Sequence, residues 1–440
     1  CGELRTGGNR RAALMFSLNW NHPDIPEFLS VKLDEKQLVN ANISVCIDRE
    51  FLKLLDNDGD IIFKWQGEER GKMKAKCLWD KIIQNAWESG DPGLMNLGLM
   101  QEQNNLIGIT EIISTNPCGE IPLSKFGSCC LGSINLSTHV VNGEIDWDLL
   151  EETVAIAVRF LDNVLDQNRY PLQQISDISS KHRRIGLGIM GLHDMLLKMR
   201  FKYDTDGARD IADKIMNFIK KRAYDTSIML AIEKGPFQLF DPDKFLKSGF
   251  VKKSLSTSLK RRIKDHGIRN CALLTIPPTG TTAIVAECSS GIEPLFQLVY
   301  RRNFNKHTKN QANKREAANE IIIHPLVKQF LESEKSVSHF QTASDILPRD
   351  HLAMQEVCQS HIDQSISKTI NLPHNYPVEE LSHVIRQFVD TLKGITIYRD
   401  GSKGESPLVP LSIEEAKKHL RDITISVSSS EECATNSCNS

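Results

Sequence analysis

The stretch Asn116-Pro117-Cys118-Gly119-Glu120 places a thiol between an amide and a carboxylate. Pro117 and Gly119 flank the thiol and disfavour a regular helix, because proline lacks an amide hydrogen and glycine is a poor helix former. We therefore expect a tight loop, in which Asn116, Cys118 and Glu120 could converge on one small ligand. The residue types alone leave a second interpretation open, in which Cys118 is a buried cysteine that acts as a small hydrophobe.

The remaining cysteines indicate redox chemistry rather than a disulfide framework. The chain of 440 residues has eleven cysteines, of which Cys129 and Cys130 follow the loop and Cys433 and Cys438 stand near the end. In a long chain without a secretory leader, reduced thiols are the usual state. The last two cysteines lie in a Ser-, Glu- and Asn-rich segment without a nearby histidine, so they cannot fill a tetrahedral zinc site. A mobile dithiol that exchanges with another disulfide fits better, and a chance pair is the alternative.

Composition and charge exclude several classes of function. Forty per cent of the residues are hydrophobic, a quarter are charged, and the formal net charge is −2. These values are typical of globular proteins, and they give no strong electrostatic field for nucleic acid or for an acidic membrane surface. We find no apolar run long enough to span a bilayer. We therefore expect a cytoplasmic protein that binds neither membranes nor nucleic acid directly.

Hydrophobic periodicity predicts an α/β protein with parallel strands. Buried strands are expected at 42–47, 271–276 and 395–398, and long amphipathic helices at 149–167 and 208–233. Such alternation of strands and helices favours a parallel sheet. Further expectations, less strongly patterned, are a turn leading into a tightly packed helix at 183–192, a polar loop at 301–315 and helices at 350–370 and 412–422.

A second candidate loop joins the expected strand 271–276 to a helix that begins at Ala283. It contains hydroxyl groups and a glycine, and backbone amides at a helix N-terminus suit a phosphate group. Gly280 is not followed by lysine, so this is not a Walker A loop. On its own the pattern fits a plain strand–helix turn better than a phosphate site. The candidate ligands are Pro278, Thr279, Gly280, Thr281 and Thr282.

Several collinear motifs give the chain a specific resemblance. The loop continues as Ile121-Pro122-Leu123 and is followed by Cys129 and by Leu131-Gly132-Ser133-Ile134-Asn135-Leu136; together these resemble the active-site segment of ribonucleotide reductases. The other motifs that agree, in the same order and over nearly the whole chain, are Gly8–Arg11, His22–Ile25, Asn42–Val45, Arg183–Gly188, Pro278–Thr281, Ser290–Pro294, Ser367–Pro373 and Gly394–Ser402.

The resemblance implies a ten-stranded α/β barrel with Cys118 at the tip of a central finger loop. Cys118 would carry a thiyl radical that abstracts the ribose 3′-hydrogen, Glu120 would act as general base for the 3′-hydroxyl, and Asn116 would hydrogen-bond the ribose hydroxyls. Cys129 would be one member of the cysteine pair that supplies two electrons, with Cys130 as the neighbouring alternative. Cys433 and Cys438 match the C-terminal shuttle that reduces this pair.

The resemblance also predicts that the barrel is incomplete. The family's other reducing cysteine lies upstream of the Gly8–Arg11 motif, and Cys1 is too close to that motif to be it. We therefore expect residues 1–410 to form a barrel portion that lacks the first strand and the effector region, and residues 411–440 to form a flexible tail. An N-terminal partner segment, joined by splicing or bound noncovalently, would complete the enzyme. The Cys1 start fits intein splicing and an artificial boundary equally well.

The class of reductase is predicted from one position. Class I enzymes receive the radical through adjacent tyrosines, whereas this chain has Tyr398 followed by Arg399. The residues of the motifs, including the form Asn-Pro-Cys-Gly-Glu, resemble those of class II enzymes, which use adenosylcobalamin. The expected partners are a ribonucleoside di- or triphosphate, a thioredoxin-like reductant and a second copy in a homodimer. The alternatives are a class I large subunit that uses a metal-bearing radical subunit, and a non-catalytic assembly half.

Overall fold

The computed structural model describes residues 13–33, 38, 41–128, 130–307, 315–402 and 408–421. Cys1, Cys129, Cys433 and Cys438 lie outside these ranges. Within them, no helix has both the length and the apolar character needed to cross a bilayer.

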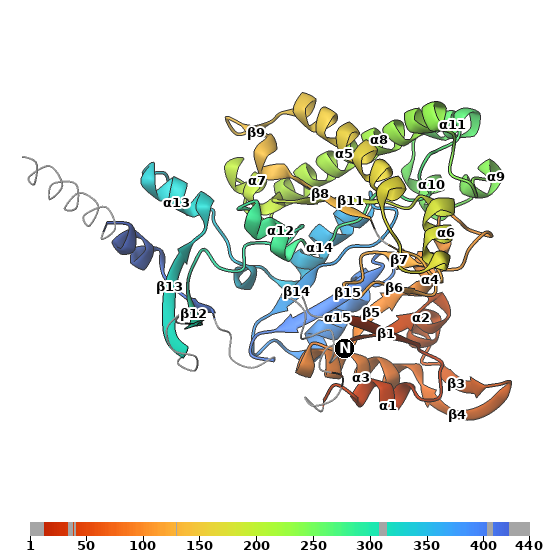
Figure 1. Cartoon of the computed structure of the whole chain (residues 1–440). Helices are drawn as coiled ribbons and strands as arrows, with labels where there is room; N and C mark the ends of the chain where they lie inside the picture. Colours follow the sequence, from red (N-terminus) through yellow and green to blue (C-terminus); the bar gives the residue numbers. More distant parts are fainter. Residues whose placement is uncertain are drawn as a thin grey trace, which may run out of the picture.

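The centre of the molecule is a five-stranded sheet of order β1-β2-β5-β15-β14 (Figure 1). β1, β2 and β5 are parallel to one another, and so are β15 and β14. The two groups meet antiparallel where β15 pairs with β5. The bounds are β1 Leu14–Asn19, β2 Ala41–Ile47, β5 Gly93–Asn96, β15 Gly394–Arg399 and β14 Thr369–Leu372.

A second parallel pair, β8 (Leu131–Asn135) and β11 (Gly186–Met190), continues this sheet through segment 271–276. Isolated parallel bridges join Leu187 to Leu274 and Ile276 to Ile366, just before β14. Gly188 permits the close approach of this segment, because a Cβ there would lie 2.5 Å from the carbonyl oxygen of Thr275. The strands of these two sheets and segment 271–276 thus form one strand succession, with β1 at one end and β8 at the other. Neither β1 nor β8 has a second neighbour among the described strands.

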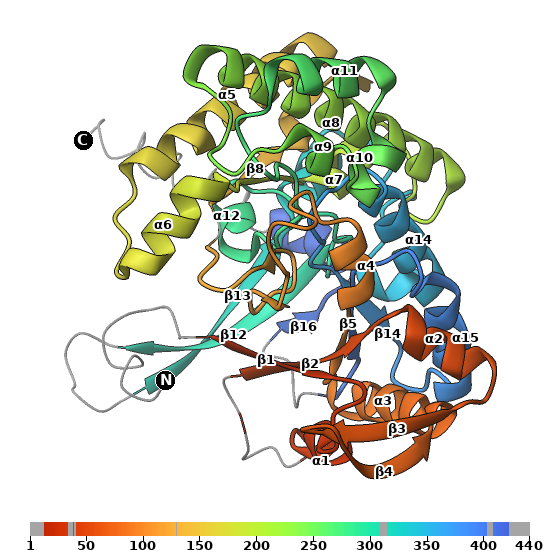
Figure 2. The same cartoon turned by 90° about the vertical axis from the view of Figure 1, so that its right-hand side faces the viewer.

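Helices cover the succession on two sides (Figures 1 and 2). α5 (Trp147–Gln167) and α8 (Asp206–Lys234) pack on the β8–β11 side, where the larger hydrophobic cluster lies. α3 (Ala75–Ser89) and α15 (Val378–Phe388) share a second cluster with the five-stranded sheet. The other helices are α1 Ile25–Ser30, α2 Arg49–Asp56, α4 Leu97–Glu102, α6 Gln173–His182, α7 Leu192–Lys198, α9 Pro242–Phe245, α10 Gly249–Ser254, α11 Thr257–His266, α12 Gly280–Val285, α13 Pro325–Glu332 and α14 Pro348–Gln359.

Short hairpins and a separate small sheet complete the described part. The hairpins are β3–β4 (Asp60–Trp65, Glu68–Lys74), β6–β7 (Ser114–Thr115, Pro122–Leu123) and β9–β10 (Val140–Val141, Glu144–Ile145). The small sheet has the order β13-β12-β16, with bounds Arg315–Ile323, Val299–His307 and Leu408–Pro410.

The expected mixed α/β class is confirmed, and most of the strongly patterned elements are correct. The helices at 149–167 and 208–233 and the strands at 42–47 and 395–398 are present as α5, α8, β2 and β15. Residues 413–421 are helical, which agrees with the helix expected at 412–422 as far as the described residues extend. Segment 271–276 is fully buried but forms only isolated bridges.

Three expectations about local structure are wrong. The run 183–192 is mainly strand β11, because β8 and segment 271–276 pair with it on both sides. Within the polar stretch 301–315, the described residues 301–307 and 315 are strand, since β12 pairs with both β13 and the distant β16. The helix expected over 350–370 ends at Gln359, and β14 occupies its last residues.

Candidate functional site

The finger loop, residues 114–123, is a short antiparallel hairpin with Cys118 near its tip. β6 and β7 pair at its base. Gly119 has a positive φ of 82° and donates its amide to the carbonyl of Asn116 at 2.9 Å. The side-chain oxygen of Asn116 accepts a hydrogen bond from the amide of Ile121 at 3.0 Å. The loop is therefore closed by its own polar groups, and the Asn116 side chain serves this closure.

Strands β1 and β2 tie the loop to the sheet. Asn42 on β2 donates its side-chain amide to the carbonyl of Pro117 at 2.7 Å. The hydroxyls of Ser17 on β1 and Ser114 share a hydrogen bond of 2.9 Å. Because the Asn42 contact lies next to Cys118, it fixes the position of the thiol relative to β2. Sequence reasoning did not assign these anchors, although Asn42 belongs to one of the motifs that carried the resemblance.

The opposite side of the loop is held through Glu120. Its backbone carbonyl accepts hydrogen bonds from the hydroxyl of Thr275 at 2.7 Å and from the amide of Ser365 at 2.9 Å. These two donors belong to neighbouring segments that the Ile276–Ile366 bridge joins. The finger loop is thus fixed from both halves of the strand succession.

The Cys118 cavity, of about 220 Å³, opens beside the loop tip. Cys118 is exposed and lines it together with residues of β2, β5 and β15. The lining includes Asn42, Gly93, Leu94, Ile395 and Thr396. The cavity therefore lies where the strand direction reverses between β5 and β15. Asn116 and Glu120 do not line it.

Glu120 lies buried next to this cavity. The residue is 1% exposed, and its Oε2 atom has no hydrogen-bond partner. Burial raises the pKa of the Glu120 carboxyl, although a hydrogen bond from Asn116 partly opposes the shift. Burial also raises the pKa of the Cys118 thiol, and the negative charge of Glu120 raises it further. Cys118 is therefore held as a thiol, and Glu120 keeps one oxygen free to accept a proton.

Cys130, the alternative to Cys129, packs against α5. Its sulfur lies 3.7 Å from the carbonyl oxygen of Leu161, to which the thiol can donate. Burial, followed by the charge of Asp162, raises the pKa of the Cys130 thiol. Its partly buried side chain contacts the larger hydrophobic cluster. This environment suits a structural cysteine and gives Cys130 no contact with the finger loop.

The candidate phosphate loop follows segment 271–276 directly. Thr279 adopts a left-handed conformation with a φ of 51° and precedes the short helix α12. Its hydroxyl accepts a hydrogen bond from the amide of Gly291 at 2.8 Å, and its carbonyl accepts one from the hydroxyl of Thr282 at 3.1 Å. The remaining candidates, Pro278, Gly280 and Thr281, are exposed. The loop is thus accessible and begins three residues after Thr275.

A buried ion pair lies behind the phosphate loop. Lys368 donates to Glu293 at 2.6 Å and contacts His351 at 3.0 Å, while the other oxygen of Glu293 accepts from the amide of Thr369 at 2.6 Å. Glu293 stands two residues after Gly291, which holds Thr279. The pair therefore links β14 to the loop. Lys368 was missed, although it lies in the Ser367–Pro373 motif.

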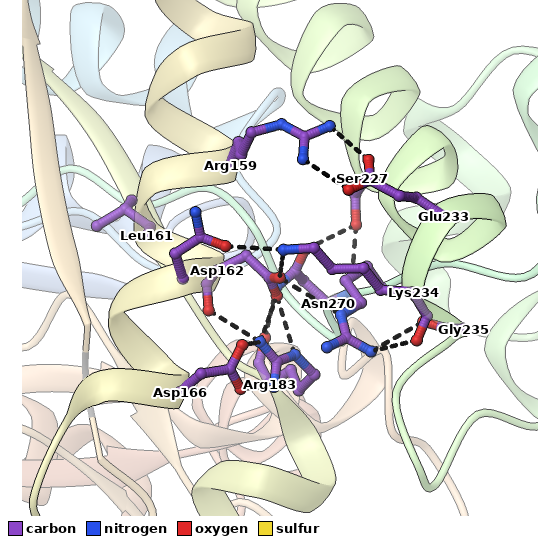
Figure 3. A network of polar contacts seen from close by, with 12 residues as sticks. Arg159, Leu161, Asp162, Asp166, Arg183, Ser227, Glu233, Lys234, Gly235 and Asn270 are labelled. Atoms are coloured by element: carbon purple, nitrogen blue, oxygen red, sulfur yellow. Dashed lines mark hydrogen bonds and ion pairs between the residues drawn. The ribbon is translucent and has the colours of Figure 1, made fainter.

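A larger polar cluster secures the far side of the strand succession. In Figure 3, Asp162 on α5 receives hydrogen bonds from Arg183 at 2.9 Å and from Asn270 at 3.0 Å. Arg269 at 3.4 Å and Lys234 at 3.8 Å also approach its carboxylate. The Asp162 cluster, defined by these residues, joins α5 and α8 to the starts of β11 and segment 271–276.

The described residues offer no obvious place for a metal ion. Among them, no group of three or more His, Cys, Asp or Glu side chains is arranged to hold one.

Comparison of the sequence with known proteins places this site in a family. Residues 1–398 match the family described as "Ribonucleotide reductase, barrel domain", and the chain belongs to this family. A vitamin B12-dependent ribonucleoside-diphosphate reductase of Thermoplasma acidophilum is 39% identical over 96% of this chain and 55% of its own length. Its counterpart in Mycobacterium tuberculosis is 34% identical, over 91% of this chain and 58% of its own length.

A more distant relative is named differently. A ribonucleoside-diphosphate reductase subunit alpha of Chlamydia trachomatis is 28% identical over 68% of this chain and 34% of its own length. The chain thus spans about half the length of the two vitamin B12-dependent relatives and a smaller part of this one.

Proposed function

We propose that this chain forms the catalytic barrel portion of a ribonucleotide reductase that converts ribonucleoside di- or triphosphates into 2′-deoxyribonucleotides. The observation that carries the proposal is the pairing of Cys118, which faces a cavity, with Glu120, which is buried beside it and has an unpaired oxygen. Raised pKa values of both groups suit this chemistry, since the thiol must carry hydrogen and the carboxylate must accept a proton.

In the proposed reaction, the Cys118 sulfur radical removes the 3′-hydrogen of the ribose and becomes a thiol. Glu120 takes the proton of the 3′-hydroxyl, and the 2′-hydroxyl leaves as water after it is protonated. Two electrons come from a cysteine pair that becomes a disulfide, and Cys118 finally returns the hydrogen to C3′. Cys129 is proposed as one member of that pair. Asn116 would orient the ribose hydroxyls once its bond to Ile121 gives way, because its side-chain oxygen is already engaged.

Substrate phosphates are proposed to bind at Pro278, Thr279, Gly280, Thr281 and Thr282. Two observations support this placement. The loop is exposed, and it continues from segment 271–276, whose Thr275 holds the carbonyl of Glu120. A ligand that reached from Cys118 along this segment would place its phosphates at the loop.

Adenosylcobalamin is proposed as the cofactor because the vitamin B12-dependent relatives carry that dependence in their names. The described residues around Cys118 do not fit the whole cofactor, however. A cavity of about 220 Å³ lacks the room for a corrin ring, and a drug-sized ligand alone needs about 300–1,000 Å³. The corrin would therefore need residues beyond those that line the cavity.

We further propose that another polypeptide segment completes a ten-stranded barrel. Support comes from β1 and β8, each of which has only one neighbour among the described strands. An open edge exposes unpaired amides and carbonyls and is suited to accept a further strand. The N-terminal half of the enzyme is the proposed source. A homodimer, a thioredoxin-like reductant, and Cys433 and Cys438 as the shuttle that passes its electrons inward remain parts of this proposal.

The test is a reductase assay of the chain combined with an N-terminal half taken from a relative, with adenosylcobalamin and without a metal-bearing subunit. Cys118→Ser should abolish deoxynucleotide formation, whereas Cys77→Ser, which alters an exposed thiol on α3, should leave it unchanged. Deoxynucleotide formation by the Cys118→Ser protein would refute the mechanism. Turnover only after a metal-bearing subunit is added would instead favour a class I large subunit.

A further inference from the structure

A second cavity lies away from Cys118. It has a volume of about 610 Å³ and is bordered by the β9–β10 turn, the C-terminal end of α7 and helix α13. Cavities of about 300–1,000 Å³ are typical of small-molecule sites. None of the residues that line it belongs to the finger loop, the Cys118 cavity or the phosphate loop. We call it the α13 cavity.

Charge in the α13 cavity is of one sign. Lys198, Arg200 and Lys335 line it, and no lining residue carries a carboxylate. Lys198 is oriented by a hydrogen bond of 2.5 Å to the carbonyl of Ser137. Arg200 is exposed, and its guanidinium has no hydrogen bond or ion pair with any other described residue. Protein cations are usually neutralised by nearby carboxylates, so a cavity with three cations and none of the opposite charge suits an anion.

Arg200 lines the cavity from the turn that ends α7. Its φ is +65°, a left-handed conformation that arginine rarely adopts. The amide of Arg200 donates to the carbonyl of Leu197 at 3.1 Å, which closes the turn at the end of α7. Together with the hydrogen bond from the amide of Phe201 to the carbonyl of Leu196 at 2.9 Å, this contact forms a Schellman motif, so the left-handed conformation belongs to the end of the helix.

The floor of the same cavity is apolar. Leu326 and Phe330 of α13 are buried and belong to a small hydrophobic cluster, and Met199 and Val140 complete the floor. The amine of Lys335 lies 5.8 Å from the centre of the Phe330 ring, which places a cation at the edge of the apolar surface. The amide side chains of Asn142 and Gln329 add hydrogen-bonding groups. Cations beside an apolar floor fit a ligand that has both phosphate groups and a flat ring.

We propose that the α13 cavity binds a nucleoside polyphosphate, with its phosphates at Lys198, Arg200 and Lys335 and its base against Phe330 and Leu326. Because this site shares no residue with the Cys118 cavity, the proposal stands independently of the proposed reaction. A guanidinium contributes bidentate contacts to phosphate oxygens. Loss of one such charged contact should weaken binding by about tenfold.

The test uses the whole chain and periodate-oxidised ATP, whose dialdehyde forms a borohydride-reducible bond to a nearby lysine amine. Peptide mapping should place the label on Lys335 or Lys198, and ATP should compete for it. Lys328 lies on α13, is exposed and does not line the cavity, so it should remain unlabelled. Label found only on other lysines would overturn the proposal.

Titration calorimetry with ATP provides the second measurement. Arg200→Gln and Lys335→Gln should each weaken ATP binding by about tenfold, whereas Lys328→Gln, the matched control, should not. Equal loss in all three variants would show a diffuse charge effect and would refute a defined site. Inorganic tripolyphosphate should bind at least tenfold more weakly than ATP. Equally tight binding of tripolyphosphate would refute the role of the apolar floor.

Discussion

Asp162 and Glu120 are both buried carboxylates, and they lie in opposite electrostatic surroundings. Asp162 is fully buried and faces Arg183, Arg269, Lys234 and the amide of Asn270 (Figure 3). Glu120 is equally hidden from solvent, but one of its oxygens has no partner. A carboxylate whose hydrogen-bonding capacity is satisfied holds elements together, whereas one with a free oxygen is ready to react.

These two carboxylates show that the two sides of the strand succession have different roles. The Asp162 cluster joins α5, α8, β11 and segment 271–276, and so fixes the scaffold. Thr275, Ser365 and Asn42 instead hold the finger loop through its backbone, which leaves the side chains of Cys118 and Glu120 available. The scaffold thus uses charged side chains for stability, and the site uses backbone contacts for position.

The largest effect should come from removing the reactive carboxylate. Glu120→Gln should lower kcat/KM of the completed reductase by about 10²–10⁴-fold, the range for a lost general base. In the parent enzyme, the acid limb of the pH–rate profile should lie above the ordinary glutamate pKa, because burial raises the pKa of Glu120. The profile should be measured from pH 5 to 9. An acid limb at the ordinary value would argue against Glu120 as the base.

The same variant should fold at least as well as the parent. A raised carboxyl pKa means that the folded state holds this proton more tightly than the unfolded state does. Folding stability from this group is therefore lost as pH rises through the raised pKa. At neutral pH, the neutral glutamine avoids that loss. A marked destabilisation of Glu120→Gln in urea unfolding would show that the carboxylate is structural.

The next effect in size concerns the scaffold. Asp162→Asn should reduce the free energy of unfolding by about 3 kcal/mol, because it leaves buried cations without their carboxylate. Arg183 retains Asp166, which limits the loss. Urea unfolding should be compared with Arg159→Ala, which removes a solvent-exposed ion pair with Glu233 and should change stability little. Equal losses in the two variants would contradict the structural role of the Asp162 cluster.

The smallest effect is electrostatic coupling between Glu120 and Cys118. Near pH 8, iodoacetamide should alkylate Cys118 more slowly than Cys77, although both are exposed, because burial and Glu120 raise the pKa of Cys118. Glu120→Gln should accelerate Cys118 alkylation, because removal of the negative charge lowers the pKa of the thiol. The rates can be followed by peptide mass spectrometry. An unchanged Cys118 rate in the variant would show that the two groups are not coupled.

Local sequence patterns were sufficient to predict part of the fold and part of the candidate site. The apolar periodicity of α5 and α8 is strong over many turns, so both helices were predicted correctly. Pro117 and Gly119 specify a loop by backbone chemistry, and the structure has a hairpin tip there with a positive φ at Gly119. Such features depend on neighbouring residues, and a single sequence contains them.

The other features of the fold and the site depend on contacts between distant segments, which the sequence alone did not reveal. β12 is a strand because β13 and β16 lie beside it, and its own polar residues gave no such signal. The bond from Asn42 to Pro117 and that from Thr275 to Glu120 join residues far apart in the sequence. The α13 cavity likewise combines β9–β10, α7 and α13, none of which contains a recognisable motif.

The antiparallel pairing of β5 with β15 has a consequence for biosynthesis. Leu94 pairs with Ile395, so the two walls of the Cys118 cavity come from segments that lie about 300 residues apart in the chain. During synthesis, the finger loop emerges long before the strand that encloses it. Contacts of such long sequence separation form late in folding. Cys118 should therefore remain an ordinary accessible thiol on the ribosome until β15 has been synthesised, and its special environment should arise only after that strand pairs with β5.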